Sequence, residues 1–254
     1  MFRVMIRDNM STVSKEILEA SGKIEVVVDN DAATSHPKAL SEIIGEFHGL
    51  AVRSGTEVTE EVLKNAKKLR VIGRAGIGID NIDVQAATKQ GVVVMNAPGG
   101  NTITTAEHTV SLMLALARNI PQGTASLRKG KWEKKRFSGV EITGKTLGII
   151  GLGHIGRVVA DRAKGLKMAV IASDPYVSSE ASKSLEVELV PLNELFQRSD
   201  FITLHVPRLK ETVGMINATT IGMMKQGVRI INCSRGEIIK IDDLYQAILS
   251  GHVS

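Results

Sequence analysis

The chain has 254 residues, a formal net charge of +5 and a hydrophobic content of 43%, enough for one large domain or two modest domains with a sizeable core. It contains no apolar run of about 18 residues, so a membrane-spanning helix is not expected. Its single cysteine, Cys233, excludes an internal disulfide framework and fits a reducing cytoplasm. Aromatic residues make up only 3%, and the densest basic run, residues 128–136, is interpreted as a solvated loop face. We therefore expect a cytoplasmic protein that binds neither membrane nor nucleic acid.

Short apolar runs alternate with helix-compatible stretches, which is the pattern of an α/β protein with parallel sheets. The strands predicted in the first part of the chain are residues 3–6, 24–28, 49–52, 71–73 and 92–95. The helices predicted between them include residues 14–20, 38–44 and 60–66. The run Ala97-Pro98-Gly99-Gly100-Asn101 then interrupts the pattern as a turn or hinge would. We place a domain boundary here, with a first domain of residues 1–98 and a second of residues 99–254.

A long helix is predicted after this turn. Thr104 or Thr105 can cap it, and Glu107 adds negative charge to its first turn. Apolar residues cover more than half of its circumference, which predicts burial on more than one side. The helix is expected to be a spine between the domains or part of a subunit interface.

A second alternating series follows this helix. Its predicted strands are residues 146–150, 169–173, 186–189, 201–205 and 228–231, and its last predicted helix is residues 241–249. A further parallel strand is expected after that helix. We therefore expect the second domain to be incomplete at its C-terminal end, without its last strand and the helix that returns to the first domain.

Gly151, Gly153 and Gly156 form a GxGxxG pattern between a predicted strand and a predicted helix, and Asp174 ends the next predicted strand. This context is the one that a dinucleotide-binding fingerprint requires. The first glycine permits a tight turn, the second lets the backbone approach a pyrophosphate, and the third lets the helix pack against the strand. The helix N-terminus offers N–H groups to phosphate, and Asp174 can accept hydrogen bonds from ribose hydroxyls. The pattern predicts NAD rather than NADP, because the Asp174 carboxylate would repel a 2′-phosphate.

Two alternatives apply to this segment. The glycines could form a turn without a ligand, although the strand, turn, helix and acid all fall in the expected order. His154, between two of the glycines, could be a catalytic base. We favour a position at the start of the helix, close to the pyrophosphate.

Several further motifs together resemble the D-2-hydroxyacid dehydrogenases. They are Arg53-Ser54-Gly55-Thr56, residues 73–83, Asn96-Ala97-Pro98, Asn101 with Thr104, Ala106 and Glu107, residues 118–122, residues 130–133, Leu204-His205-Val206-Pro207, and Asn232-Cys233-Ser234-Arg235-Gly236. The resemblance covers the chain in order. The motifs at residues 53–56, 118–122 and 130–133 are most similar to the branch of the family that acts on a phosphorylated glycerate.

The resemblance implies a flavodoxin-like substrate domain, a Rossmann domain that binds NAD, a small anionic 2-hydroxy acid as substrate, and a homodimer or homotetramer. It implies that Arg235 is catalytic and holds the carboxylate and carbonyl side of the substrate. The residues that it implies for substrate binding are Arg53, Arg74, Gly76 and Asn101. Besides the fingerprint, those that it implies for NAD binding are Ile77, His154, Ile155, Val206, Pro207, Cys233 and Ser234. No metal is expected.

The chain departs from the family pattern in two places. The family's catalytic glutamate and histidine both follow the arginine and are expected beyond residue 254, and Glu237 stands where a second glycine is common. Two hypotheses therefore stay open: a dehydrogenase, or an NAD(H)-binding module without turnover that resembles the corepressor members of the family. Other 2-hydroxy acids, such as glycerate, hydroxypyruvate or lactate, also stay open as substrates.

Overall fold

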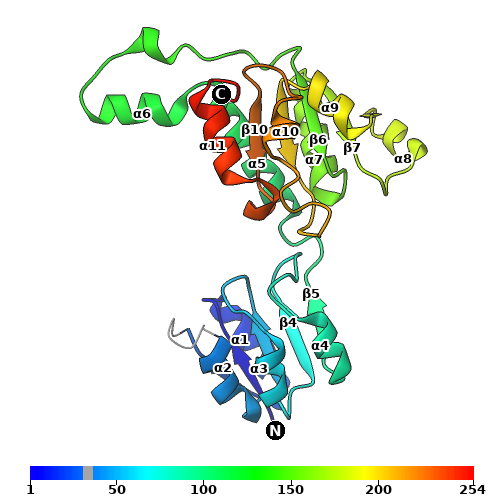
Figure 1. The fold of residues 1–254 in the computed structure, drawn as a ribbon. Helices are drawn as coiled ribbons and strands as arrows, with labels where there is room; N and C mark the ends of the chain where they lie inside the picture. The colour runs from blue at the N-terminus through cyan, green and yellow to red at the C-terminus, as the bar shows by residue number, and fades with distance from the viewer. Residues whose placement is uncertain (31–36) are drawn as a thin grey trace. The chain divides into compact units, whose positions relative to one another are not determined.

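The structure is a computed structural model, and it describes residues 1–30 and 37–254. The chain divides into two compact units, Met1–Asn101 and Thr102–Ser254 (Figure 1). The division falls at the end of the turn that was predicted at residues 97–101. Each unit has its own parallel sheet and is described by itself.

The first unit contains one sheet with the strand order β2-β1-β3-β4-β5. Its strands are β1 (Phe2–Ile6), β2 (Ile24–Val28), β3 (Gly49–Val52), β4 (Val71–Arg74) and β5 (Val93–Asn96). Its helices are α1 (Thr12–Glu19), α2 (Pro37–Ile43), α3 (Glu60–Asn65) and α4 (Val84–Lys89), with a 3-10 turn at Ile44–Glu46. All strand pairs are parallel, and this order is that of flavodoxin-like folds.

Local sequence explains where two of these helices begin. Thr59 accepts a hydrogen bond from the Val62 N–H at the start of α3, and Asp83 accepts one from the Ala86 N–H at the start of α4. The central strands contribute Leu50 and Ile72 to the core, where both are fully buried. A sheet covered on both faces explains why these strands are almost continuously apolar in the sequence.

The second unit contains a sheet with the order β10-β9-β6-β7-β8, again with only parallel pairs. Its strands are β6 (Thr146–Ile150), β7 (Ala169–Ser173), β8 (Glu188–Leu189), β9 (Phe201–Leu204) and β10 (Arg229–Asn232). Its helices are α5 (Thr102–Ala117), α6 (Ile120–Arg128), α7 (His154–Gly165), α8 (Ser179–Ser184), α9 (Leu192–Arg198), α10 (Ala218–Ile221) and α11 (Ile241–Leu249), with 3-10 turns at Lys134–Phe137 and Gly236–Ile238. Numbered within the unit, the order is 3-2-1-4-5, as in Rossmann folds.

These two sheets confirm the predicted fold class. Val253 forms a parallel bridge with Val228, and the Ser254 N–H donates to the Val228 carbonyl at 2.9 Å. This pairing lies beside the start of β10, where a sixth strand stands in the Rossmann order. Among the described residues, every helix is too short or too polar to cross a membrane.

Two predictions about the start of the long helix were wrong. Helix α5 begins at Thr102, so Thr104 and Thr105 lie inside its first turn instead of capping it, and Glu107 lies beyond that turn. The fully buried residues of α5, Ala106, Thr109, Met113 and Ala117, follow a single helical face, while Leu112 stays 40% exposed. Burial of a second side, which was predicted against the other domain or another subunit, stays a prediction.

The strand predicted at residues 186–189 is shorter than expected and covers only Glu188–Leu189. Glu186 has a φ of 51°, in the left-handed region, and its N–H donates to the Lys183 carbonyl in the turn after α8. A residue in this conformation cannot continue a strand.

Candidate functional site: the carboxyl edge of the second sheet

Four loops leave the carboxyl ends of neighbouring strands in the second unit. The glycine-rich loop follows β6, Asp174 follows β7, His205 follows β9, and the segment 233–235 follows β10. Strand order reverses between β6 and β9. Ligands of open α/β sheets bind at this type of switch point. The fold therefore brings the residues that were predicted to bind NAD in this unit to one edge of one sheet.

The glycines of the loop have the distinct roles that the fingerprint predicts. Gly151 has a φ of +93°, and a Cβ there would lie 2.7 Å from the His205 carbonyl oxygen. A Cβ on Gly156 would collide with the Gly151 carbonyl oxygen, so this glycine lets α7 pack against the loop. Around Gly153 there is no heavy atom within 4 Å of an added Cβ among the described residues. The free space therefore lies where a pyrophosphate has to approach the backbone.

Helix α7 presents its N-terminus at this free space. Gly153 is its N-cap and supplies no side-chain hydrogen bond, and the first residues of the helix are His154 and Ile155. Unsatisfied N–H groups at a helix start, together with the helix dipole, attract phosphate. On the opposite side of the loop, Arg157 Nε donates to the Leu152 carbonyl at 3.1 Å and holds the loop against the helix. The residues present therefore fit the pyrophosphate of a dinucleotide.

Asp174 is half-buried and faces the glycine-rich loop. Its Oδ2 accepts a hydrogen bond from the Leu152 N–H and its Oδ1 accepts one from the Tyr176 N–H, both at 2.8 Å. A carboxylate oxygen can accept two hydrogen bonds, so each oxygen keeps capacity for a ribose hydroxyl. The same bonds fix the carboxylate next to the loop. The sequence predicted the ribose contact but not this second role as a brace of the loop.

His205 lies at the switch point but is not suited to acid–base chemistry. Its Nε2 is 3.0 Å from the Thr203 hydroxyl, and its Nδ1 is buried without a hydrogen-bond partner among the described residues. Burial lowers the pKa of His205 to about 4. The ring is therefore neutral at physiological pH and a weak base. Val206, which follows, is half-buried and would lie 3.0 Å from a Cβ at Gly151, whereas Pro207 is exposed.

Arg235 is held at the end of β10 by an asparagine that the sequence analysis did not single out as a positioning group. Asn232 Oδ1 accepts from the Ser234 N–H at 2.9 Å and from the Ser234 hydroxyl at 2.7 Å. Asn232 Nδ2 donates to the Arg235 carbonyl at 2.8 Å. The side chain of Arg235 is half-buried, and Cys233 packs against the unit's core. An Asn side chain can accept a hydrogen bond from the backbone N–H two residues later and so form an Asx turn. An Asn at the end of a predicted strand could therefore have indicated this role.

Glu237, the departure from the family pattern, pairs with Arg208. The Arg208 Nε lies 3.2 Å from Glu237 Oε1, and both side chains are about half exposed. The pair links the loop after β9 to the turn after Arg235. Because both groups are in contact with solvent, we attribute little stability to it.

The carboxyl edge of the first sheet holds the arginines that were predicted to bind substrate. Arg53 follows β3 and is exposed, and Asp8 follows β1, so the two flank the switch point of this sheet. Asp8 Oδ2 accepts from the Arg53 N–H at 2.6 Å and from the Thr56 N–H at 3.2 Å. Asp8 Oδ1 accepts from the Thr56 hydroxyl at 2.6 Å. One carboxylate thus fixes the backbone of the Arg53 loop.

A second loop, from Arg74 to Asn81, is tied to the first. Asn81 Nδ2 donates to the carbonyls of Arg53 and Thr56, at 2.8 and 2.6 Å. The side chain of Arg74 packs over Gly76, where a Cβ would collide with the guanidinium. The two loops therefore form one hydrogen-bonded structure.

The remaining predicted residues of this unit lie on the same structure or beyond it. Asn96 Nδ2 donates to the Ile77 carbonyl at 2.8 Å, and the Ala97 N–H donates to the Gly76 carbonyl at 3.0 Å. Asn101 is exposed, at the last position of the unit. Asp8 was not predicted from the sequence as a positioning group. Its signal was an Asp-Asn pair one residue after a strand, because these residue types tolerate the left-handed conformation that Asp8 adopts at φ 61°.

Comparison with known proteins places these sites in a family. Residues 110–254 match the model for the D-isomer specific 2-hydroxyacid dehydrogenase, NAD binding domain. The chain is 48% identical over 254 residues to the D-3-phosphoglycerate dehydrogenase of Methanocaldococcus jannaschii, covering 100% of this chain and 48% of the relative. It is 45% identical over 252 residues to the protein of the same name from Homo sapiens, covering 98% of this chain and 46% of the relative. The chain thus spans about half the length of the curated relatives it matches.

Solved structures of similar fold include the TT0316 protein from Thermus thermophilus, with a TM-score of 0.89, 30% identity, and coverage of 99% of this chain and 79% of that one. An NAD-dependent formate dehydrogenase from Staphylococcus aureus in complex with NAD has a TM-score of 0.87 and 26% identity, with coverage of 100% and 79%. The family model covers more than half of the chain and includes the glycine-rich loop, Asp174 and Arg235. The second unit is thus an NAD-binding domain, and the chain belongs to the D-isomer specific 2-hydroxyacid dehydrogenase family.

Proposed function

We propose that this chain is the NAD-binding and carboxylate-binding part of a D-3-phosphoglycerate dehydrogenase, which oxidises 3-phospho-D-glycerate to 3-phosphohydroxypyruvate in the first step of L-serine biosynthesis. The observation that carries the proposal is the 48% identity to a protein of that name along the whole chain. The held position of Arg235 at the switch-point edge of the sheet supports it. Other 2-hydroxy acids are the alternative substrates.

Different residues of the second unit would bind different parts of NAD and of the substrate. Gly153 and the start of α7 would hold the pyrophosphate of NAD, and Asp174 would hold the adenosine ribose. When bound, NAD supplies the acceptor for a hydride. Arg235 would grip the substrate carboxylate through two parallel hydrogen bonds and so orient the carbon that is oxidised. Asn232 fixes the backbone of Arg235 and thereby the origin of that side chain.

The reaction also requires a base that removes the proton of the substrate hydroxyl. His205 is neutral, but with a pKa of about 4 it accepts a proton poorly near neutral pH. We assign this role to the histidine, supported by a glutamate, that the family places later in the chain than Arg235. If no such group acts with this chain, the alternative is an NAD(H)-binding regulatory module without turnover.

A turnover assay of the 254-residue chain beside a version extended through the family histidine tests the proposal. With saturating NAD and 3-phosphoglycerate, we expect NADH to form with the extended chain and little or none with the 254-residue chain. A general base contributes about 10²–10⁴-fold, so its loss alone nearly silences the reaction. Failure of the extended chain to oxidise 3-phosphoglycerate, while it binds NAD, would favour another substrate or the regulatory module. Turnover of the shorter chain within about tenfold of the longer would show that the base lies within these residues.

Assembly and location complete the proposal. The segment from α5 to Trp132 exposes large apolar side chains, with Leu127 at 56% and Trp132 at 80% exposure, and a second copy of the chain would cover them in a homodimer or homotetramer. Light scattering of the wild-type chain beside a Leu127→Ser variant tests this assembly. The single cysteine supports a cytoplasmic location.

A further inference from the structure

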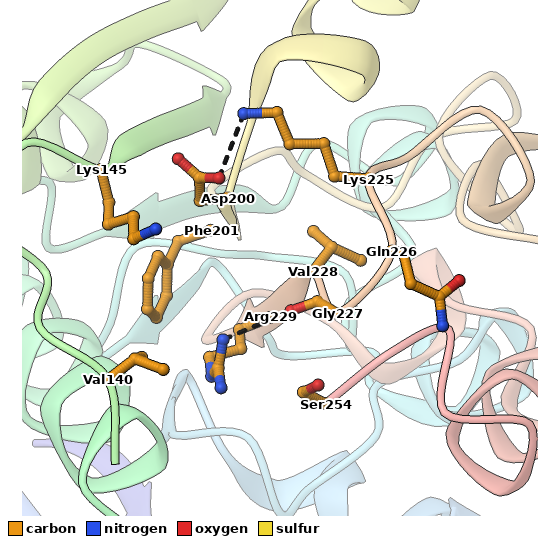
Figure 2. A pocket seen from close by; sticks show the side chains of 10 residues that line it. All are labelled: Val140, Lys145, Asp200, Phe201, Lys225, Gln226, Gly227, Val228, Arg229 and Ser254. Atoms are coloured by element: carbon orange, nitrogen blue, oxygen red, sulfur yellow. Dashed lines mark hydrogen bonds and ion pairs between the residues drawn. The ribbon is translucent and has the colours of Figure 1, made fainter.

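The amino-terminal edge of the second sheet carries a pocket of about 280 Å³. It forms where β9 and β10 begin and where the chain enters β6, and its walls include Lys145, Asp200, Phe201, Lys225 and Arg229. Figure 2 shows Lys145 and Phe201 along one side, Gln226 and Ser254 along the other, and Arg229 between them. Phe201 begins β9 and His205 follows its last residue. The pocket and the glycine-rich loop therefore lie at opposite ends of the same strands.

The walls of this pocket are fixed by backbone hydrogen bonds. The Asp200 N–H donates to the Thr146 carbonyl at 2.9 Å, and the Arg229 N–H donates to the Asp200 carbonyl at 3.1 Å. The Gly227 N–H donates to the His252 carbonyl at 2.8 Å. Within the described residues, these three bonds hold the backbone around the pocket in place.

The lining residues carry an excess of positive charge, with Lys145, Lys225 and Arg229 against the single carboxylate of Asp200. Both oxygens of Asp200 are already engaged, because Oδ2 accepts from the Thr146 N–H at 2.8 Å and Oδ1 accepts from Lys225 Nζ at 3.1 Å. Burial acts to raise the pKa of Asp200, but the Thr146 N–H, Lys225 and the charge of Lys145 together outweigh it and hold the pKa below its usual value. The carboxylate thus forms its ion pair with Lys225, while Lys145 and Arg229 make no ion pair with it.

Lys145 and Arg229 have no carboxylate within ion-pair distance in the described part of the chain. The Arg229 guanidinium lies over the Phe201 ring, 5.5 Å from its centroid, and its Nη1 donates to the Gly227 carbonyl at 3.3 Å. These contacts orient a half-buried planar donor at the pocket, and most of its five N–H groups are left for a ligand. Lys145 adds a mobile point charge from the segment that enters β6.

We propose that this pocket binds a small phosphate-bearing anion, independently of NAD and of the reaction. Its volume falls just below the range of pockets for drug-sized ligands, about 300–1,000 Å³, which fits a small ligand. A guanidinium that presents parallel donors matches the oxygens of a phosphate, and Lys145 complements its second negative charge. The ligand is either inorganic phosphate or the phosphate group of a small ester.

Isothermal titration of the chain extended through the family histidine, in which Ser254 carries no terminal carboxylate, with inorganic phosphate and with glycerol 2-phosphate at constant ionic strength tests the proposal. We expect saturable binding of at least one of the two. The tighter ligand shows whether the pocket prefers inorganic phosphate or the phosphate group of a small ester. Arg229→Gln should weaken binding about tenfold and Lys145→Gln about three- to fivefold. Acetate, which carries a single charge, should bind more weakly than phosphate. Binding of acetate as tight as that of phosphate, or wild-type phosphate affinity in a variant that carries both Arg229→Gln and Lys145→Gln, would overturn the proposal.

Two control variants distinguish binding at this pocket from binding elsewhere on the chain. Lys64→Gln removes the same charge from an exposed lysine that pairs with Glu60 in the first unit, and it should leave phosphate affinity unchanged. Gly153→Val fills the free space at the start of α7 and should also leave it unchanged. Loss of phosphate binding in Gly153→Val would place the anion at the dinucleotide loop and contradict the proposal. If Arg229→Gln lowers the thermal midpoint, Arg229→Lys retains the charge and should bind phosphate between wild type and Arg229→Gln.

Discussion

The two parallel sheets of this chain each use a carboxylate to hold a loop at the carboxyl edge, but the loops present different groups to a ligand. In the first unit, the Asp8 and Asn81 side chains bond to the backbone of the loop that carries Arg53. In the second unit, the loop after β6 consists largely of glycine and leads straight into α7. A loop that presents a charged side chain has to be fixed by neighbours that occupy its backbone groups. A loop that presents its own N–H groups has to leave those that face the ligand unoccupied, here the groups at the start of α7, and needs room beside them.

The two edges also differ in their exposure to solvent. Arg53 is exposed at the first edge, whereas His205, at the corresponding point of the second, is mostly buried. Burial costs much more free energy for a charged ring than for a neutral one. The second edge is therefore suited to a cofactor ring, and the first to an anion that arrives from water. Four substitutions, in order of decreasing expected effect, test this contrast.

The largest effect is expected from Gly156→Val, because its side chain would collide with the Gly151 carbonyl. Relief requires that α7 move away from the loop, and over-packing of this kind costs up to about 3 kcal/mol of unfolding free energy. Urea denaturation followed by circular dichroism measures the loss. Gly153→Ala is the matched control: it should leave stability within about 0.5 kcal/mol of wild type and weaken NAD binding. Equal free energies of unfolding for Gly156→Val and Gly153→Ala would show that the contact between α7 and the loop has room for a side chain at residue 156.

His205 should make the protein less stable in mild acid. Its pKa is lowered to about 4 in the folded chain from an ordinary value of 6.5, so the unfolded chain binds the proton more readily. The stability contribution is complete above about pH 6.5 and falls as the pH drops toward 4, by up to about 3 kcal/mol. Urea unfolding of wild type and of His205→Gln, at pH 7 and at pH 4.5, isolates this term. Between pH 7 and pH 4.5 the variant should lose less free energy of unfolding than wild type. An equal loss would show that water reaches the His205 ring.

The contrast between the edges also explains what could be predicted from the sequence. The glycine-rich loop and Asp174 were predictable because the fingerprint is local, with each glycine serving a need of the adjacent backbone. The strands were predictable because sheets covered on both faces produce continuous apolar runs. The start of α5 was not, because Thr102, Thr104 and Thr105 are all plausible caps by residue type.

The braces of the first edge were missed for a different reason. Asp8 and Arg53 are 45 residues apart, and Asn81 and Arg53 are 28 apart. Contacts of this kind depend on the order of strands in the sheet, which residue periodicity does not reveal. The same holds for the proposed phosphate pocket, whose cations come from the segment that enters β6 and from the segment that enters β10. The substrate-binding role that the family resemblance implies for Arg53 and Arg74 stays a prediction, whereas the groups that hold their loops emerged only with the fold.

Asp174→Ala should weaken NAD binding and narrow the preference for NAD over NADP. Charge-assisted hydrogen bonds of this type contribute about 1.5–3 kcal/mol, or roughly ten- to a hundredfold in affinity. Part of the loss comes from the freed Leu152 N–H, which now bonds to the carboxylate. Asp174→Asn separates the two effects, because an amide oxygen can still accept that bond while the charge that repels a 2′-phosphate is gone. In titrations with both cofactors, the Asp174→Asn variant should bind NAD with an affinity between those of wild type and Asp174→Ala. An unchanged preference for NAD over NADP in both variants would show that Asp174 is not part of the site.

Asp8→Asn is expected to have the smallest effect, and it acts on the first edge alone. The amide keeps one acceptor oxygen and the left-handed backbone, but it loses the second acceptor and the charge. The bonds to Arg53 and Thr56 cannot all persist, so the loop should be destabilised by about 1 kcal/mol. Hydrogen–deuterium exchange should quicken in peptides that cover residues 53–58 and stay unchanged in those that cover the glycine-rich loop. In the extended chain, the KM for substrate should rise several-fold while the Kd for NAD stays constant. Glu25→Gln, the same chemical change at an exposed ion pair with Arg3, is the control and should alter neither quantity. A rise in the Kd for NAD, or an unaltered exchange rate at residues 53–58, would mean that the first edge does not depend on this carboxylate.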